Sequence, residues 1–263
     1  MISNLILVLL LVLSNFNVCT PNILSLTNRV HYTALSSIAE NHHIHLFALT
    51  ETWITPFTTS AELLDSVPTG FSLLSFPRPA CPNNKNKIIG GGTAFLVHDS
   101  CQILSSSSPV FKSFEISIVT LKLSKSRLTV FNVYRPPPSS TKAVPFSQFL
   151  IDFQTLVSLA ATTSHDFLIT GDFNHHVDDN QNSQANQFLS VASNLVQLVT
   201  FPTHRNGHTL DLIITAADSP LFPKTSYSRL SPSDHFPVFS QLTIQPPHHL
   251  LYSLKSHSDV LML

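Results

Sequence analysis

The sequence contains few charged residues and has almost no net charge. Only 11% of the 263 residues are charged, and 14 Lys and Arg against 15 Asp and Glu give a formal net charge of −1. A nearly neutral chain lacks the broad basic surface by which many proteins attract nucleic acids. Any phosphate binding must therefore depend on a local site.

Cysteines are also scarce. Cys19, Cys81 and Cys101 are odd in number and widely spaced, and they form no CxxC pair. This pattern argues against a disulfide framework and against a zinc knuckle, and it fits a reducing compartment. We therefore expect a nuclear or cytoplasmic protein.

Long apolar runs are absent from the sequence, and we expect no membrane span. The run "LILVLLLVL" at residues 5–13 is much shorter than the roughly 20 residues that cross a bilayer. Its length fits a signal peptide, yet the first basic residue, Arg29, follows the run instead of preceding it. Residues 1–20 are therefore a first strand, leftover upstream sequence, or a signal that would lead to secretion.

The apolar content of 43% is enough to fill one large domain, which we place at residues 21–245, followed by an irregular tail at 246–263. Helical spacing of apolar residues predicts helices at 32–44, Phe146–Ala161 and 183–196. Apolar or alternating runs predict strands at 44–51, 70–76, 90–97 and 165–170, in "TLDLIIT" and "SPSDHFPVFSQLTI", and a hairpin across 124–126. Strands and helices without a regular βαβ order favour two packed sheets with outer helices.

Polar residues interrupt these strands at their ends. They are Glu51, Tyr134, Asp172, Asn174, Asp211, Asp234 and His235. Taken singly, each has an ordinary explanation as a turn, cap, strand or core residue. If the sheets bring them into one crevice, they supply oxygen ligands for Mg²⁺, with Glu51 and Asp234 as candidates, and an imidazole of His235 oriented by Asp211.

Seven segments together resemble the endonuclease/exonuclease/phosphatase superfamily. In chain order they are "NILSLTNR", "LFALTETW", "GGGTAFLV", "FNVYRPP", "LITGDFN", "HTLDLII" and "SDHFPV". The resemblance spans residues 22–244 and is strongest to the endonuclease domain of non-LTR (LINE-type) retrotransposons. Those proteins continue into a reverse transcriptase, so we expect a stand-alone or truncated piece.

The resemblance implies a four-layered α/β sandwich and a Mg²⁺-dependent enzyme, with Mn²⁺ as the alternative ion, that nicks DNA and binds it mainly through its backbone. It implies metal binding by Glu51 and Asp234. Asp172 would orient and deprotonate the attacking water, and Asn174 would hold water or phosphate. The remaining family positions fall on residues that would contact or stabilise the phosphate or close the site, namely Tyr134, His235 with Asp211, and Asn22.

Two features leave alternatives open. Pro21 directly precedes Asn22, and because proline cannot donate a ladder hydrogen bond, the first strand and the position of Asn22 are uncertain. The alternatives are a secreted nuclease, a phosphatase acting on lipids or small molecules, and a domesticated, non-catalytic binding domain. The residues that follow the "GDFN" motif, His175, His176, Asp178 and Asp179, are expected to form a solvated loop.

Overall fold

The computed structural model describes residues 15–55, 57–78, 90–123, 126–138, 144–179, 181–192, 194–221 and 223–243. The apolar run at 5–13, Cys81 and the tail at 246–263 lie outside the described residues, so the expectations for them stay predictions.

Helices and strands alternate along the chain without a fixed repeat. The helices are α2 (Arg29–His42), α3 (Ser60–Leu64), α4 (Phe146–Ala161) and α5 (Ser183–Val191). The strands are β1 (Asn15–Thr20), β2 (Leu46–Thr50), β3 (Phe71–Phe76), β4 (Thr93–His98), β5 (Gln102–Ser107), β6 (Glu115–Leu123), β7 (Ser126–Tyr134), β8 (Asp166–Asp172), β9 (Leu195–Gln197), β10 (Asp211–Ala216), β11 (Lys224–Tyr227) and β12 (Val238–Thr243).

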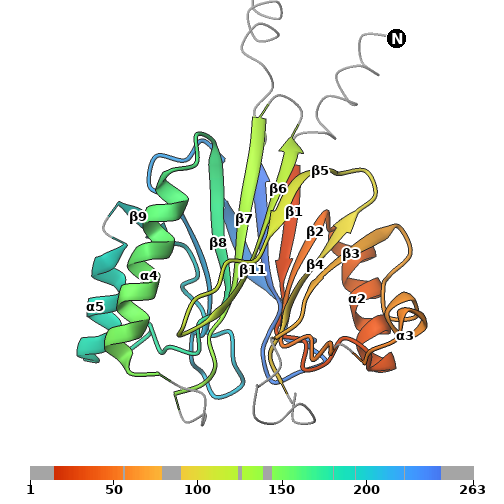
Figure 1. Cartoon of the computed structure of the whole chain (residues 1–263), viewed down its shortest axis with the longest axis horizontal. Coiled ribbons are helices and arrows are strands. Elements are labelled where there is room, and N and C mark those ends of the chain that lie inside the picture. The colour runs from red at the N-terminus through yellow and green to blue at the C-terminus, as the bar shows by residue number, and fades with distance from the viewer. Residues whose placement is uncertain are drawn as a thin grey trace, which may run out of the picture.

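Two mixed six-stranded sheets pack face to face between two layers of helices, which confirms the predicted four-layered sandwich (Figure 1). One sheet has the order β11-β12-β1-β2-β4-β3, and the other has the order β5-β6-β7-β8-β10-β9. Helices α2 and α3 cover the first sheet, and α4 and α5 cover the second (Figure 1). The predicted hairpin is the antiparallel pair β6 and β7.

Strand β1 resolves the question raised by Pro21. The strand ends at Thr20, one residue before the proline, and it lies between β12 and β2. The carbonyl of Pro21 accepts a hydrogen bond from the Thr50 amide at 3.2 Å, and Asn22 forms an isolated bridge with Thr50. The proline therefore stands where its missing donor costs no ladder bond, and Asn22 stays attached to the sheet edge.

Several predicted boundaries were wrong. The helix expected at 183–196 ends at Val191, because β9 begins at Leu195 and pairs with β10. The strand expected from residue 90 begins at Thr93, since all three preceding glycines have positive φ angles of 79–83°. Strand β2 ends at Thr50, so Glu51 follows the strand. The short elements α3, β5, β9 and β11 carry no strong period and were not predicted.

The faces that the two sheets turn toward each other change from apolar to polar along the strands. Side chains alternate between the faces of a strand, so residues two apart share a face. In β8, Leu168 lies in the core between the sheets, and Thr170 and Asp172 follow on the same face. In β10, Ile213 lies in that core and Asp211 precedes it on the same face. The inter-sheet core thus ends in carboxylates.

Hydrogen bonds join the sheets where this transition occurs. The hydroxyls of Thr20 and Thr170 are 2.7 Å apart, and the Asn132 amide donates to the carbonyl of Leu49 at 2.8 Å. All four residues are buried. Buried polar groups need such partners, and these contacts fix the two sheets relative to each other beside the carboxylates.

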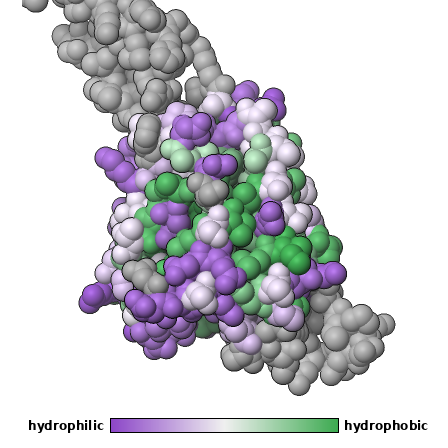
Figure 2. All heavy atoms as spheres, turned by 90° about the vertical axis from the view of Figure 1, so that its left-hand side faces the viewer, coloured by the Kyte–Doolittle hydropathy of each residue, from purple (hydrophilic) through white to green (hydrophobic). Residues whose placement is uncertain are grey.

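The side of the molecule formed by α4 and α5 mixes apolar and polar groups (Figure 2). Apolar side chains exposed on α4, α5 and β9 include Ile151, Leu159, Leu189 and Val196. The opposite faces of α4 and α5 fill the core against the second sheet with Phe149, Phe153 and Phe188. Scattered exposed apolar residues of this kind are ordinary for a protein surface.

Gly171 allows β8 to carry Asp172 beside β7. Its φ is 124°, and a Cβ atom at this position would lie 2.0 Å from the Val133 carbonyl oxygen. A backbone atom cannot move aside as a flexible side chain can. We expect Gly171→Ala to lower the free energy of unfolding by about 3 kcal/mol through strain and overpacking, measured by urea denaturation.

Gly207 provides the matched control, because it also has a positive φ, of 86°, but a Cβ there would meet nothing within 4 Å. Gly207→Ala should lower the free energy of unfolding only by the cost of the left-handed backbone conformation, about 1 kcal/mol. Equal losses in the two variants would show that the contact with Val133 is relieved without cost.

Candidate active site

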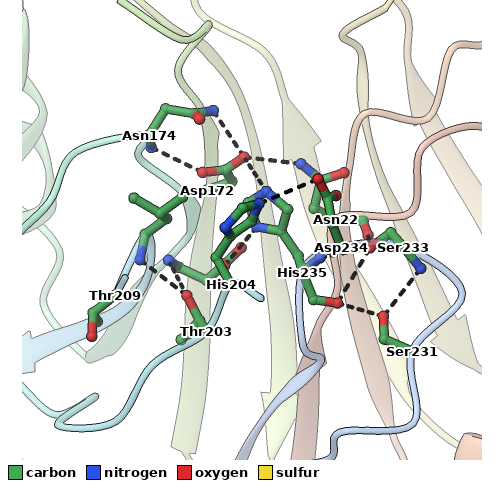
Figure 3. Close-up of polar contacts among 12 residues, drawn as sticks. Asn22, Asp172, Asn174, Thr203, His204, Thr209, Ser231, Ser233, Asp234 and His235 are labelled. Carbon is green, nitrogen blue, oxygen red and sulfur yellow. Dashed lines mark hydrogen bonds and ion pairs between the residues drawn. The ribbon is translucent and has the colours of Figure 1, made fainter. Parts of the chain in front are cut away.

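Asp172 is the centre of a buried hydrogen-bond network at the end of the inter-sheet core (Figure 3). The side-chain amides of Asn22 and Asn174 each donate to its Oδ2 at 2.9 Å, and the backbone amide of Asn174 donates to its Oδ1 at 2.9 Å. Asn174 has the left-handed φ of 44° that turns its amide back toward the carboxylate. The orientation of the carboxylate is therefore fixed.

The environment of Asp172 makes it a proton acceptor suited to neutral pH. Its side chain is fully buried. The pKa of Asp172 is raised to about 7, mainly by burial and also by the charge of Asp211, although the charge of His235 and the amide donors lower it. A base whose pKa lies near the working pH is the most effective proton acceptor.

His235 lies between two carboxylates. Its Nδ1 is 2.9 Å from Oδ2 of Asp211, and its Nε2 is 3.9 Å from Oδ2 of Asp172. Burial lowers the pKa of His235, but the charge of Asp211, followed by that of Asp172, outweighs burial and raises the pKa to about 10. The imidazole is therefore cationic at neutral pH, with Nε2 directed toward Asp172.

The hydroxyl groups of Thr203 and Ser233 hold the segments that carry Asp211 and His235. Thr203 Oγ1 accepts from the Leu210 and Asp211 amides at 3.0 Å each, which fixes the start of β10. Ser233 Oγ donates to the Asn22 carbonyl at 2.7 Å and accepts from the His235 amide at 3.1 Å. Ser233 thus joins the loop before β12 to the segment after β1 (Figure 3).

Asp234 lies at the rim, with its side chain half exposed. Its Oδ2 is 3.2 Å from Nε2 of His204, whose ring lies edge-on to His235 with centroids 4.9 Å apart. Burial raises the pKa of Asp234, but the contacts with His204 and His235 outweigh burial, so the pKa is lowered and the group is an anion.

Glu51 and Tyr134 form a second part of the site. The Tyr134 hydroxyl donates to Oε1 of Glu51 at 2.7 Å, and burial followed by the charge of Glu51 raises the pKa of Tyr134. Tyr134 is the register partner of Asp172 on the adjacent strand. The pairing of β7 with β8 therefore places the Glu51 contact beside the Asp172 network.

The arrangement suits a hard divalent cation. Most of the side chains at the site offer oxygen atoms as metal ligands. Oδ1 of Asp211 is buried and has no hydrogen-bond partner among the described residues. Two groups of side chains have ligand atoms within 4.8 Å of one another, namely Asp172 with Asp211 and His235, and His204 with Asp234 and His235. Glu51 belongs to neither group, so the structure does not bring the two predicted metal ligands into one such cluster.

The predicted site residues therefore fall into three sets, and hydrogen bonds or ion pairs join the residues within each set. Asn22, Asp172, Asn174, Asp211 and His235 share one network, Glu51 pairs with Tyr134, and Asp234 stands at the rim with His204. The sequence analysis assigned no role to His204, Thr203 or Ser233. Their types are common in loops, and only the spatial contacts distinguish them.

His175 is not part of a solvated loop, contrary to the prediction. It is buried, and its ring stacks on Phe146 with centroids 5.3 Å apart. Burial, with a smaller effect of Arg135, lowers the pKa of His175 to about 4. The prediction was wrong for His175 alone, because His176, Asp178 and Asp179 are exposed, as expected.

Solved structures with the same fold include nucleic-acid and sugar-phosphate enzymes. The AP endonuclease LMAP from Leishmania major aligns with 14% identity and a TM-score of 0.66 over 89% of each chain. TDP2 from D. rerio, complexed with a single-stranded DNA product, aligns with 11% identity and a TM-score of 0.64 over 88% of this chain and 99% of that chain. A mannosyl-6-phosphatase from Bacteroides thetaiotaomicron aligns with 16% identity and a TM-score of 0.61 over 87% of this chain and 100% of that chain.

These similarities define the fold class, and the sequence defines the family. Residues 15–235 match the model of the Endonuclease/Exonuclease/phosphatase family, and the chain belongs to this family. Its members are generally hydrolases of phosphodiesters or phosphate esters and typically require a divalent metal. No curated protein sequence matches the chain. In the described part of the chain, every helix is too short or too polar to cross a membrane.

Proposed function

We propose that the protein is a Mg²⁺-dependent phosphodiesterase that nicks DNA and derives from the endonuclease domain of a LINE-type retrotransposon. The observation that carries this proposal is the single network that joins Asn22, Asp172, Asn174, Asp211 and His235. Residues from four separate parts of the chain meet there with a fixed base and a fixed cation. A positioned base and a positioned cation each accelerate the hydrolysis of a phosphodiester.

In this mechanism Asp172 orients the attacking water and accepts its proton. The amides of Asn22 and Asn174 hold the carboxylate, and Asn174 also contacts the water or a phosphate oxygen. The His235 cation, held by Asp211, stabilises the negative charge that develops on the phosphate oxygens. Tyr134 contacts the phosphate or the leaving oxygen.

Glu51 and Asp234 would hold the metal ion, which is Mg²⁺ or, in its place, Mn²⁺. When bound, a divalent ion supplies positive charge for the phosphate oxygens and a template for the substrate. Both residues offer carboxylate oxygens, the ligands that Mg²⁺ prefers.

Two observations support DNA as the substrate. Two of the proteins with this fold are an AP endonuclease and an enzyme complexed with single-stranded DNA product. The seven motifs of the sequence resemble the endonuclease domain of LINE-type elements. Because the net charge is only −1, binding would rest on a few backbone phosphate contacts near the site. The test is incubation of the purified protein with supercoiled plasmid, with and without Mg²⁺, where the proposal requires Mg²⁺-dependent relaxation by single-strand nicks.

Glu51→Gln keeps the shape of the side chain and removes its charge. We expect the Mg²⁺ concentration that gives half-maximal nicking to rise by more than about tenfold, because a hard ligand is lost. Glu40→Gln, on the exposed side of α2, is the matched control and should leave that concentration unchanged. An unchanged Mg²⁺ dependence in Glu51→Gln would place the metal ligand elsewhere.

A phosphatase acting on lipids or small molecules is the second candidate, secreted if residues 1–20 act as a signal. The mannosyl-6-phosphatase with this fold and the near-neutral charge of the chain favour it. Hydrolysis of p-nitrophenyl phosphate without nicking of plasmid would support this candidate, whereas hydrolysis of bis-p-nitrophenyl phosphate together with nicking would support the phosphodiesterase. Inactivity toward all three substrates with Mg²⁺ or Mn²⁺ would indicate the non-catalytic binding domain.

A further inference from the structure

The carboxylate of Glu51 is held from two sides by neutral donors. The Tyr134 hydroxyl donates to Oε1 at 2.7 Å, and the indole Nε1 of Trp53 donates to Oε2 at 2.8 Å. Neither donor carries a charge, so the pair fixes the direction of the carboxylate without neutralising it. A fixed anion of this kind remains available to bind a cation.

The backbone around the pair is strained and clamped on both sides. Glu51 and Trp53 both have a φ of 54°, a conformation that costs free energy in residues other than glycine. On one side, the carbonyl of Glu51 accepts from the Ser25 amide at 2.8 Å. On the other side, the Trp53 amide donates to the Gly91 carbonyl at 2.9 Å. These bonds keep the indole beside the carboxylate.

Gly90 lies beside this contact. A Cβ atom at Gly90 would lie 3.8 Å from Nε1 of Trp53 and 3.9 Å from Oε2 of Glu51. The glycine run thus passes directly beside the Trp53–Glu51 hydrogen bond. Trp53 remains 39% exposed, so it is not held there by burial in a core.

We propose that Trp53 is a positioning residue that orients Glu51 for metal binding, and that its indole reports metal binding through fluorescence. The inference rests on the proposed role of Glu51 as a metal ligand. Hydrogen bonds from outside the ligand set typically change metal affinity by about 10–100-fold. Trp53 is the only tryptophan of the sequence, so its emission has a single source.

The first measurement is fluorescence of the wild-type protein during titration with Mn²⁺, a paramagnetic ion that quenches nearby fluorophores. We expect saturable quenching of Trp53, which Mg²⁺ reverses by competition. In Glu51→Gln the saturable component should disappear. Glu40→Gln, on the exposed side of α2, should titrate like the wild type.

The second measurement is Mn²⁺ affinity by electron paramagnetic resonance of the free ion, which needs neither activity nor tryptophan. Trp53→Phe keeps a ring and removes the N–H group, and we expect the Mn²⁺ dissociation constant to rise about tenfold. In the Glu51→Gln background, the same substitution should cause no further loss, because its effect acts through Glu51. Replacement of Trp53 by 3-benzothienylalanine, in which sulfur takes the place of the indole N–H, provides a closer isostere and decides the question if Trp53→Phe does not fold.

The outcomes separate this proposal from the proposed function. An unchanged Mn²⁺ affinity in Trp53→Phe, or in the benzothienyl protein, together with weak binding in Glu51→Gln, overturns the role of Trp53 and leaves the metal site in place. Independent, additive losses in the double variant also overturn it, because Trp53 would then act without Glu51. An unchanged affinity in Glu51→Gln overturns the assignment of Glu51 as a ligand, and the role of Trp53 with it.

Discussion

Asp172→Asn should lower the rate of plasmid nicking on the order of a thousandfold. The proposed mechanism gives Asp172 the proton of the attacking water, and an amide cannot accept it. Loss of a positioned general base typically costs between about a hundredfold and ten-thousandfold. The measurement is the single-turnover rate at saturating Mg²⁺, with far-UV circular dichroism to show that the variant is folded.

Asp152 is the matched control, because it is also a buried carboxylate with several hydrogen bonds. Its Oδ2 accepts from the amides of Lys112 and Ser113 at 3.0 and 2.8 Å, away from the Asp172 network. Asp152→Asn should therefore lower stability and leave the single-turnover rate of the folded protein unchanged. Retention of most activity in Asp172→Asn would assign the proton transfer to another group.

The layers of the fold could be predicted because strands and helices follow one another without a regular βαβ order, which favours two packed sheets with outer helices, and because the family resemblance implied four layers. On the face that meets the other sheet, Val130 of β7 and Leu168 of β8 lie in the core, and the residues four positions further along the same face are Tyr134 and Asp172. A polar residue at the end of a strong apolar period is therefore informative. It indicates the strand end and also the face on which the side chain lies.

The contacts within the site could not be predicted in the same way. Asn22 and Asp172 are 150 residues apart and meet because the two sheets pack together. Ser233 and Asn22 are 211 residues apart and meet because β12 pairs with β1 within one sheet. His175 shows the limit most clearly. Its polar neighbours in the sequence predicted solvent, whereas the aromatic side chains of α4 that bury it lie far away along the chain.

Element boundaries depended on pairing partners that the local pattern does not contain. The apolar period of α5 continues to Val196, yet residues 195–197 pair with β10, and strand pairing prevails over the helical period. Glu51 illustrates the same point at the site. Its left-handed backbone is held by Ser25, a residue from another segment.

Asp211→Asn should shift the pH dependence of the reaction. In the wild type, Asp211 is the main cause that raises the pKa of His235 to about 10, against the lowering effect of burial. The cation is the form that stabilises developing phosphate charge, so activity should fall only as the pH rises toward this pKa. Without the Asp211 charge, burial remains and the pKa falls. The high-pH limb of kcat/KM must then move to lower pH, and the rate at neutral pH should drop on the order of a hundredfold.

His235→Ala should lose activity to at least the same extent at every pH, because the group that titrates is absent. Asp178→Asn is the control for Asp211→Asn, since Asp178 contacts an imidazole at a similar distance, 3.2 Å from Nδ1 of His208, outside the Asp172 network. Asp178→Asn should leave the high-pH limb of kcat/KM at the same pH as in the wild type. Proton NMR titration of the His235 ring in the metal-free protein gives the pKa without reference to activity, and it should be lower in Asp211→Asn than in the wild type. If the kinetic limb and the NMR titration both stay where they are in the wild type, Asp211 does not set the charge of His235, and the proposed role of the pair is wrong.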